Sequence, residues 1–437
     1  MTRWLYAMAM WLAQPLLRRK LAQRALVEPE YGEHIEQRFG YYDAATTQSA
    51  QGGGFVWVHA VSLGETRAAE VLIHQMRLQL PGMRLLLTHG TATGCVQGRA
   101  LLQPGDVQVW QPWDSARAVR RFLAQFQPRL GLLIETEVWP TLTAECHRAG
   151  VPLCLVNARL NETSLKKAQR LAWLSRPTYA ALTAVWAQSQ EDADRLQQLG
   201  APVRGVLGNF KFDTQPDAQQ LQRGQAMRKA ATRPVLMFAS SREGEEVLLL
   251  QKFKQKWPAG GVERAQAAIK SEAIPVQLLI VPRHPQRFDE VVALCETAGY
   301  SVSRRSQWTA DTPQAADVWI GDSVGEMPMY FGLADAALLG GSFAPLGGQN
   351  LIEAAACACP VIMGPHVFNF AQAAESAAEV GAAFAVSDMS NAVEKAMALL
   401  VDPEALAQAR QQALGLSRAH AGAAKRTAEA VRALLLG

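Results

Sequence analysis

Short, uninterrupted apolar runs alternate with helix-like stretches along most of this chain. In the first half, the runs GFVWVHAVS, MRLLLTHG, VQVWQPW and RLGLLIETE are each followed by a stretch typical of a helix, and VPLCLVNAR and AVWAQSQ are further runs. Strands that are apolar on both faces have to be covered on both faces, as in a parallel sheet with helices on each side. This feature therefore predicts a doubly wound α/β domain.

The same alternation returns after a polar stretch between Phe212 and Pro234, in runs that include PVLMFASS, VQLLIVPRHP, ADVWIGDS and DAALLGGS. A chain of 437 residues is also too long for one ordinary core. We therefore predict two doubly wound, Rossmann-like domains that face each other across a cleft. The first covers residues 31–212 and the second covers 234–437, with 213–233 as the linker and the last helix a candidate to return to the first domain.

The N-terminal segment has a different character. Trp4–Leu17 is apolar and rich in aromatic residues, and a basic flank of Arg18, Arg19, Lys20 and Arg24 follows it. A membrane span needs roughly 20 apolar residues, whereas this run is shorter and is interrupted by Gln14 and Pro15. We predict a membrane-anchoring helix within residues 1–30, with its basic flank at anionic lipid headgroups. The alternative is a surface helix that packs on its own domain.

The charge pattern narrows the classes of partner. The formal net charge is +4, and the chain lacks a dense run of Lys and Arg with interleaved aromatic residues, which argues against a nucleic-acid groove. The segment Asp192–Asp194 imitates a metal-binding Asp-x-Asp motif, but it opens a polar helix, where acidic residues favour the helix dipole. The histidines and cysteines show no metal-ligand spacing. We therefore predict no metal, no cofactor and no nucleic-acid partner.

A glycine-rich loop stands directly before a glycine-free helix in GGSFAPLGGQNLIEAAACA, which begins at Gly340. A strand, a glycine loop and a helix N-terminus together present backbone N–H groups to an anion. The alternative is that the glycines only let the loop pack closely on its neighbours. The chain contains neither a P-loop motif nor a dinucleotide-binding motif. The loop 340–348 is therefore a candidate phosphate site of another type.

Two further segments follow strands of the second domain, where ligands of open α/β sheets bind. Arg283 and His284 follow LLIVP, and an arginine there can hold a phosphate with two hydrogen bonds. GDSVGEMP offers backbone groups next to Glu326, and Glu353 lies one turn into its helix as a candidate acceptor for ribose hydroxyls. Together with the glycine loop, these segments predict a nucleotide site.

Charged side chains also follow the strands of the first domain. Glu65 lies in or near the first turn of a helix, whose field favours the ionised carboxylate and weakens it as a base, so that burial or the substrate has to raise its pKa. Glu135 and Glu137 follow another strand and would face opposite ways if that strand continued. Arg159 stands in NARL, and Lys211 in GNFKFD is predicted to lie at the hinge and face the cleft.

Six motifs in this order resemble one family: HAVSLGET, LIETEVWP, VNARL, KFD, PRHPQR and GGSFAPLGGQNLIEAAACACPVIMGP. They resemble the bacterial transferases of 3-deoxy-D-manno-octulosonic acid (Kdo), and the likeness covers most of the chain. The resemblance implies a GT-B fold and a metal-independent, inverting transfer of Kdo from CMP-Kdo to a lipid A precursor, lipid IVA, in lipopolysaccharide inner-core synthesis. It also implies an enzyme at the cytoplasmic face of the inner membrane.

The resemblance further implies roles for individual residues. Glu65 matches the family's proton acceptor, and Glu135 and Lys211 match residues that stabilise the transition state. The residues that match the CMP-binding segments are Pro282, Arg283, Gly325, Glu326, Met327, Asn350, Leu351, Ile352 and Glu353. Two departures, SLGE for the familiar SVGE and GNFKFD for GSLKFD, leave Glu65 and Lys211 in place. By charge, Glu135 suits a cationic reacting centre, and Lys211 suits the donor's carboxylate or an acceptor phosphate.

Two other classes of function stay open at this point. One is another GT-B nucleotide-sugar transferase or epimerase, which would share the glycine loop but not the ETE and NARL stretches. The other is a catalytically inactive, membrane-bound nucleotide-sugar binder, against which the presence of Glu65 argues.

Overall fold

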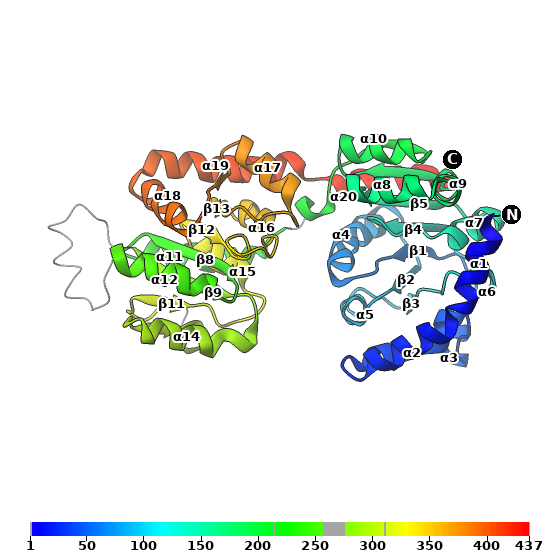
Figure 1. Ribbon diagram of the computed structural model, residues 1–437, viewed down its shortest axis with the longest axis horizontal. Coiled ribbons are helices and arrows are strands. Elements are labelled where there is room, and N and C mark those ends of the chain that lie inside the picture. The colour runs from blue at the N-terminus through cyan, green and yellow to red at the C-terminus, as the bar shows by residue number, and fades with distance from the viewer. Residues whose placement is uncertain (1, 214, 257–275, 310–311, 437) are drawn as a thin grey trace. The chain divides into compact units, whose positions relative to one another are not determined.

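The computed structural model describes residues 2–213, 215–256, 276–309 and 312–436 (Figure 1). The chain forms two compact units. The first consists of Met1–Asp213 together with Ala421–Gly437, and the second is Thr214–His420. Each unit is an α/β structure and is described here by itself.

The first unit is built on a sheet of seven strands in the order β3-β2-β1-β4-β5-β6-β7, and every strand pairs in parallel with its neighbours. The strands are β1 (Val56–His59), β2 (Leu85–His89), β3 (Val107–Trp110), β4 (Leu130–Ile134), β5 (Leu153–Ala158), β6 (Ala184–Ala187) and β7 (Val203–Val206). The chain winds from β1 to β3 and then crosses to the other side of β1 with β4. The carboxyl ends of β1 and β4 therefore form the topological switch point, where ligands of such sheets bind.

Helices cover both faces of this sheet, as the unbroken apolar runs predicted. They are α4 (Leu63–Gln79), α5 (Ala92–Arg99), α6 (Ala116–Phe126), α7 (Pro140–Arg148), α8 (Glu162–Arg170), α9 (Ala172–Ala180), α10 (Gln190–Gln198) and α20 (Ala423–Leu436). Alternate residues of β1 enter separate cores. Trp57 packs with Phe122 of α6, whereas Val58 packs in the cluster that contains Leu72 of α4 and Val431 of α20.

The second unit repeats this plan with the strand order β10-β11-β9-β8-β12-β13-β14, again with parallel pairing throughout. Its strands are β8 (Val235–Ser241), β9 (Gln277–Pro282), β10 (Val302–Arg304), β11 (Val318–Ile320), β12 (Ala336–Leu339), β13 (Val361–Met363) and β14 (Ala383–Ala385). The switch point of this sheet lies between β8 and β12. Its helices include α11 (Ala218–Ala230), α12 (Glu245–Lys256), α14 (Phe288–Thr297), α15 (Met327–Leu333), α16 (Leu351–Ala356), α17 (Ala371–Glu379), α18 (Met389–Val401) and α19 (Pro403–His420).

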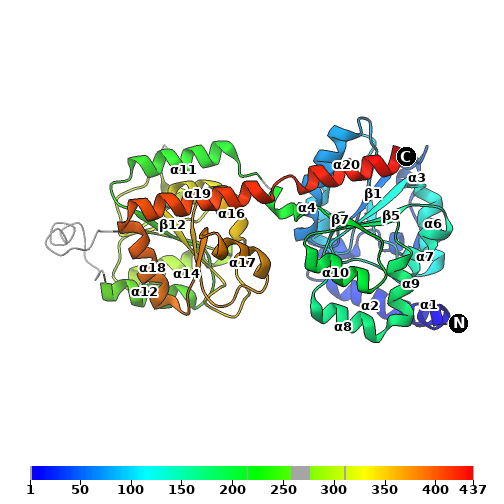
Figure 2. The same ribbon diagram turned by 90° about the horizontal axis from the view of Figure 1, so that it is seen from above.

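The final helix belongs to the first unit, so the predicted second domain, 234–437, extends too far. α20 lies against α4 in both views (Figures 1 and 2). Its N-terminus is capped by Asp213, which ends the short 3-10 helix η3 (Phe210–Asp213). The Asp213 carboxylate accepts hydrogen bonds from the N–H groups of Gly422 and Ala424, the latter at 2.5 Å. The last helix therefore returns to the first unit, a possibility that the sequence had left open.

The segment predicted as a linker, 213–233, is instead mostly the helix α11. The helix packs on α15 so closely that the backbones touch. A Cβ atom on Gly224 would lie 2.0 Å from the carbonyl oxygen of Met329, and one on Gly332 would lie 2.7 Å from that of Leu221. The polar composition concealed this helix, because one of its two buried residues is a glycine, which adds nothing to an apolar pattern.

We expect Gly224→Ala to destabilise the second unit by about 1–3 kcal/mol, because the added methyl group must push α11 away from α15. The matched control is Gly415→Ala in α19, where a Cβ atom would meet no atom within 4 Å. That change should be neutral or stabilising by up to about 1 kcal/mol, since alanine favours a helix. Urea unfolding of both variants measures the difference, and equal stabilities would refute the close packing of α11.

The N-terminal segment forms two helices, α1 (Thr2–Leu12) and α2 (Gln14–Ala25). Across the described part of the chain, no helix combines the length and the apolar character needed to cross a membrane. α1 contacts its own unit, since the Tyr6 hydroxyl donates a 2.7 Å hydrogen bond to Asp114 and the Trp113 indole donates one of 3.1 Å to the Met10 carbonyl. Trp11 and Leu16 nevertheless stay 62% and 70% exposed.

Candidate active site

The predicted site residues follow strand ends in both units, and Glu65 and Glu135 lie at the switch point of the first sheet. In the first unit, Glu65 follows β1 and Glu135 follows β4, the two strands that flank the switch point. In the second unit, residues 242–246 follow β8 and the glycine loop 340–348 follows β12. Each unit thus carries one candidate site.

A capping arrangement holds Glu65 in the first turn of α4. Ser62 is the N-cap, and its hydroxyl accepts a 3.4 Å hydrogen bond from the N–H of Glu65. In return, the Glu65 carboxylate accepts a 2.6 Å hydrogen bond from the N–H of Val61. This is the pattern of a capping box, with the glutamate reaching back one residue beyond the N-cap. The carboxylate is therefore directed toward the carboxyl end of β1.

Burial raises the pKa of Glu65 to about 7. The carboxylates of Glu135 and Glu137 also raise this pKa, whereas the hydrogen bonds with Val61 and Ser62 lower it. A carboxyl group with a pKa near neutrality is both available and strong enough to act as a general base. The structure therefore supplies the burial that a base at a helix N-terminus requires.

The chain turns sharply at Glu135, where β4 ends. Glu135 has a φ of +63°, which is uncommon for a residue other than glycine, and its buried carboxylate forms a 3.1 Å ion pair with the Nε atom of Arg159. Glu137 accepts a 2.9 Å hydrogen bond from the indole N–H of Trp139, and burial raises its pKa. Because of the turn, both carboxylates act on Glu65 rather than facing opposite ways, as they would on a continuing strand.

Three amide side chains connect Lys211 to the end of β5. The Asn157 Oδ1 atom accepts a 3.0 Å hydrogen bond from the N–H of Phe210, and the Gln188 amide donates one of 2.9 Å to the Asn157 carbonyl. Asn209 links the other side, since its amide donates to Gln188 Oε1 at 3.0 Å and its Oδ1 accepts from the N–H of Lys211 at 3.0 Å. These bonds fix the backbone of Lys211 relative to β5, the neighbour of β4.

We expect Asn157→Ala to lower kcat by about 10- to 100-fold, because a small displacement of a positioned group is costly to catalysis. The variant also leaves the Phe210 N–H without its acceptor, at a cost in stability of about 1–3 kcal/mol. The control is Asn161→Ser, which keeps a side-chain cap at the exposed start of α8. Rates measured at a temperature where both variants are folded separate the two effects. An unchanged kcat in Asn157→Ala would remove the amide network from the site.

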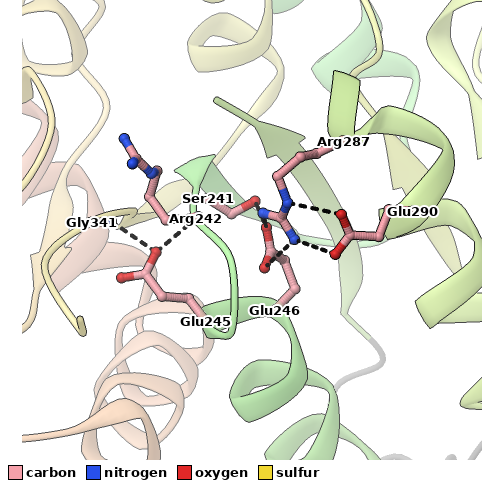
Figure 3. Close-up of polar contacts among 7 residues, drawn as sticks. All are labelled: Ser241, Arg242, Glu245, Glu246, Arg287, Glu290 and Gly341. Atoms are coloured by element: carbon pink, nitrogen blue, oxygen red, sulfur yellow. Dashed lines mark hydrogen bonds and ion pairs between the residues drawn. The ribbon is translucent and has the colours of Figure 1, made fainter. Parts of the chain in front are cut away.

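The glycine loop of the second unit already contains an anion, which is a side chain of the protein itself (Figure 3). The buried carboxylate of Glu245 accepts a 2.8 Å hydrogen bond from the N–H of Gly341. It also accepts hydrogen bonds from the N–H groups of Phe343 (3.0 Å) and Ala344 (3.1 Å). It accepts another of 3.0 Å from the N–H of Arg242. The amides of Gly341, Phe343 and Ala344 are therefore bonded to Glu245, and a phosphate site at the loop 340–348 stays a prediction.

Close packing accounts for two of the glycines in this region. A Cβ atom on Gly340 would lie 2.1 Å from the carbonyl oxygen of Ser240, and one on Gly364 would lie 2.4 Å from that of Ser342. Neither position can carry a side chain. Close packing, the alternative given for these glycines in the sequence analysis, therefore explains Gly340. The next glycine, Gly341, donates its N–H to Glu245.

Basic side chains surround the carboxyl ends of β8 and β9. The N–H of Arg283 donates a 3.1 Å hydrogen bond to the Ser241 carbonyl, and the Arg283 side chain is exposed. Burial lowers the pKa of His284, and the guanidinium groups of Arg242, Arg283 and Arg287 lower it as well. The three arginines therefore form one cationic patch around His284 at this edge of the sheet.

The segment 325–327 follows β11 and opens α15. Gly325 has a φ of +84°, in the left-handed region that favours glycine. The Glu326 carboxylate accepts hydrogen bonds from Arg305 Nη2 at 3.0 Å and from the Ser323 hydroxyl at 2.5 Å. The carboxylate of Glu326 is held by these bonds. The backbone groups of Gly325 and Met327 are therefore better candidates than this carboxylate for contact with a nucleobase.

The segment 350–353 follows the glycine loop. Asn350 is the N-cap of α16, and its Oδ1 accepts a 3.1 Å hydrogen bond from the N–H of Ile352. Leu351 and Ile352 are 1% and 2% exposed, so their side chains belong to the interior and only their backbones can face a ligand. Glu353 is half-buried, and Pro282 is buried at the end of β9. All predicted nucleotide-binding residues thus follow or end β9, β11 or β12.

The Asp-x-Asp segment has a structural role. Asp192 is buried, and its carboxylate accepts a 2.8 Å hydrogen bond from the N–H of Leu160 and a 2.9 Å one from the hydroxyl of Ser189, the N-cap of α10. Asp194 is exposed and accepts from Gln190. Within the described ranges, no three or more His, Cys, Asp or Glu side chains group in a way that could hold a metal ion.

Comparison with known proteins decides the family. Residues 33–214 match the family described as 3-deoxy-D-manno-octulosonic-acid transferase (kdotransferase). A 3-deoxy-D-manno-octulosonic acid transferase of Bordetella pertussis is 44% identical over 381 residues, which are 86% of this chain and 86% of that protein. The chain belongs to this family. Another member, from Haemophilus influenzae, is 28% identical over 92% of this chain and 91% of that protein. This Kdo transferase is therefore a glycosyltransferase, as the motifs predicted.

Solved structures confirm the fold class of this Kdo transferase. A UDP-GlcNAc 2-epimerase of Neisseria meningitidis has a TM-score of 0.56 at 13% identity and covers 86% of this chain and 99% of its own. A glycosyltransferase of Rickettsia africae has a TM-score of 0.54 at 12% identity and covers 88% of this chain and 99% of its own. At these identities the likeness shows the fold alone, which is GT-B-like.

Sequence reasoning missed two groups of residues in this Kdo transferase. Glu245 and Glu246 follow β8 in SSREGEE, and an acidic pair directly after a buried strand was an available signal. Asn157 was not singled out within VNARL, although a polar residue at the end of an apolar strand is itself unusual. Gln188 and Asn209 offered no signal of this kind, because their role depends on contacts between distant parts of the chain.

Proposed function

We propose that this Kdo transferase moves Kdo from CMP-Kdo to a lipid A precursor, lipid IVA, with inversion at the anomeric carbon and without a metal ion. Family membership supplies the reaction class. The observation that carries the mechanism is the half-buried Glu65, whose pKa is raised to about 7 at the switch point of the first unit. Such a group suits the deprotonation of a sugar hydroxyl at neutral pH.

In the proposed reaction, Glu65 takes the proton of the acceptor hydroxyl while that oxygen forms a bond to the anomeric carbon of Kdo. The bond between this carbon and the phosphate oxygen breaks, and its electron pair leaves with CMP. The carboxylate of Glu135 carries the right charge to stabilise an oxocarbenium-like centre. Arg283 stabilises the departing phosphate, and Lys211 faces the donor's carboxylate or an acceptor phosphate.

A pocket of about 310 Å³ in the first unit supports the placement of the acceptor. Leu63 and Arg67 line it from α4, within one turn of Glu65, and Val96 lines it from α5. Glu28 and Glu30 line it as well, so the pocket combines apolar, acidic and basic side chains. Its apolar part suits an acyl chain, and its polar part suits the hydroxyl groups of a sugar. We propose that part of the acceptor enters here.

The N-terminal segment supports a location at the cytoplasmic face of the inner membrane. Trp11, Leu12 and Leu16 expose apolar side chains, and Arg19 and Lys20 expose basic ones shortly after them. Such a segment can bind lipids by lying on an anionic membrane surface. We propose this interfacial mode for residues 1–30, with inner-membrane lipids as the partner.

The test is transfer from CMP-Kdo, generated in situ, to tetraacylated lipid A precursor in the presence of EDTA, with mass spectrometry of the product. We expect a product whose mass increases by Kdo units, formed with or without EDTA. A matched reaction with UDP-GlcNAc should give neither transfer nor epimerisation. Loss of activity in EDTA, with recovery on addition of Mg²⁺, would refute the metal-independent mechanism. Turnover of UDP-GlcNAc alone would refute the proposed donor.

A further inference from the structure

The carboxylate of Glu245 fills the anion-binding side of the glycine loop. Four backbone N–H groups, from Arg242, Gly341, Phe343 and Ala344, point at its two oxygens at 2.8–3.1 Å. Burial raises the pKa of Glu245, and the hydrogen bonds from these four amides lower it, so they favour the ionised form. The Glu245 carboxylate, which accepts all four of these hydrogen bonds, thus takes the place at these amides that a phosphate could otherwise occupy.

The same residue places a negative charge next to the predicted nucleotide site. A phosphate that approaches the loop therefore meets repulsion from Glu245 unless cations compensate for it. The cationic patch at the ends of β8 and β9 provides them. Arg287 is not available, because its guanidinium group binds Glu246 at 2.7 Å and Glu290 at 3.0 Å (Figure 3).

Arg242 and Arg283 are placed differently. The backbone of Arg242 donates to Glu245, and its side chain turns away from that carboxylate (Figure 3). The Arg242 Cγ atom lies 3.7 Å from the position of a Cβ on Gly341, so the side chain runs beside the glycine loop. Within the described residues, neither the Arg242 nor the Arg283 guanidinium group forms an ion pair with a carboxylate.

We infer that Glu245 is a positioning residue that holds the glycine loop in shape, and that Arg242, together with Arg283, binds the phosphate of the donor nucleotide. This inference rests on the proposed function, which makes CMP-Kdo the donor. It assigns the phosphate to guanidinium groups rather than to the amides of Gly341, Phe343 and Ala344. Charge-assisted hydrogen bonds from arginine suit both the phosphodiester of CMP-Kdo and the more highly charged monoester of the departing CMP.

Calorimetric titration of the full chain with CMP and with cytidine tests the role of Arg242. We expect Arg242→Met to weaken CMP binding by roughly 10- to 100-fold and to leave cytidine binding unchanged, because only CMP carries the phosphate. Glu394→Gln, a change at an exposed residue of α18, is the control and should alter neither affinity. If Arg242→Met binds CMP as tightly as the wild type does, the inference is overturned. Wild-type protein that binds no CMP would instead overturn the proposed donor, and the inference with it.

Glu245→Gln tests the positioning role in the same titrations. The glutamine side chain turns one N–H₂ group toward the loop amides, so we expect the loop to shift and both CMP and cytidine to bind more weakly. Glu245→Asp keeps the charge and should restore part of both affinities. If Glu245 were only a placeholder that phosphate displaces, Glu245→Gln would bind CMP more tightly than the wild type. Circular dichroism confirms that the variants compared are folded.

Discussion

Replacing Glu65 with glutamine should lower kcat above neutral pH by about 10²- to 10⁴-fold, the usual contribution of a general base. The glutamine side chain can still accept the hydrogen bond from the Val61 N–H, so the start of α4 should keep its geometry. In the wild type, we expect kcat to rise with pH through about 7, the pKa of Glu65, and then to level off. The residual rate of the variant should not show this rise. Initial rates of Kdo transfer across the pH range measure both effects.

The same substitution should have an opposite effect on stability. The pKa of Glu65 is raised from 4.5 to about 7 by folding, so the folded state holds its proton more tightly than the unfolded state. Stability is therefore lost as pH rises from 4.5 through 7, and Glu65→Gln removes this loss. Above neutral pH, the variant should be more stable than the wild type by about 1–3 kcal/mol. Glu70→Gln, an exposed change on the same helix, is the control. Equal stabilities at all pH values would show that folding does not raise the pKa of Glu65.

The sequence predicted those features that depend on local pattern. Unbroken apolar runs identified strands covered on both faces, and their alternation with helices led to two parallel sheets. The placement of Glu65 and Glu135 at strand ends followed from the same pattern, because strand order then brings β1 and β4 together. Motif resemblance, rather than spacing, connected these positions to Kdo transfer.

The sequence could not predict contacts that distant segments make through small or polar groups. α11 was mistaken for a linker because Gly224, which touches Met329, leaves no apolar signature. The glycine loop suggested an anion, but the ligand of its amides lies about 100 residues earlier, in SSREGEE. The turn at Glu135 was also hidden, since a left-handed glutamate cannot be distinguished from a strand residue by composition. In each case the outcome depended on a distant contact or on a backbone conformation, neither of which the local pattern of residue types encodes.

Replacing Glu135 with glutamine should give the second-largest loss of activity, about 10²-fold in the plateau kcat, because it removes the carboxylate proposed to stabilise the cationic centre. It should also lower the pKa of Glu65, since the Glu135 carboxylate is one of the groups that raise it. The rise of kcat with pH should therefore move to lower pH. The glutamine keeps the size of the side chain and the left-handed backbone, so the fold should persist, although the ion pair with Arg159 is lost.

Glu137→Gln separates these two effects of Glu135. The Glu137 carboxylate also raises the pKa of Glu65, so its removal should move the pH profile in the same direction. Glu137 is bonded to the Trp139 indole, which a glutamine oxygen can still accept, and we assign it no contact with the reacting centre. Its plateau kcat should therefore fall far less than that of Glu135→Gln. If both variants lose the same plateau activity, the two carboxylates act only through the pKa of Glu65. If neither shifts the profile, then burial alone sets that pKa, and the acidic cluster at the end of β4 has another purpose.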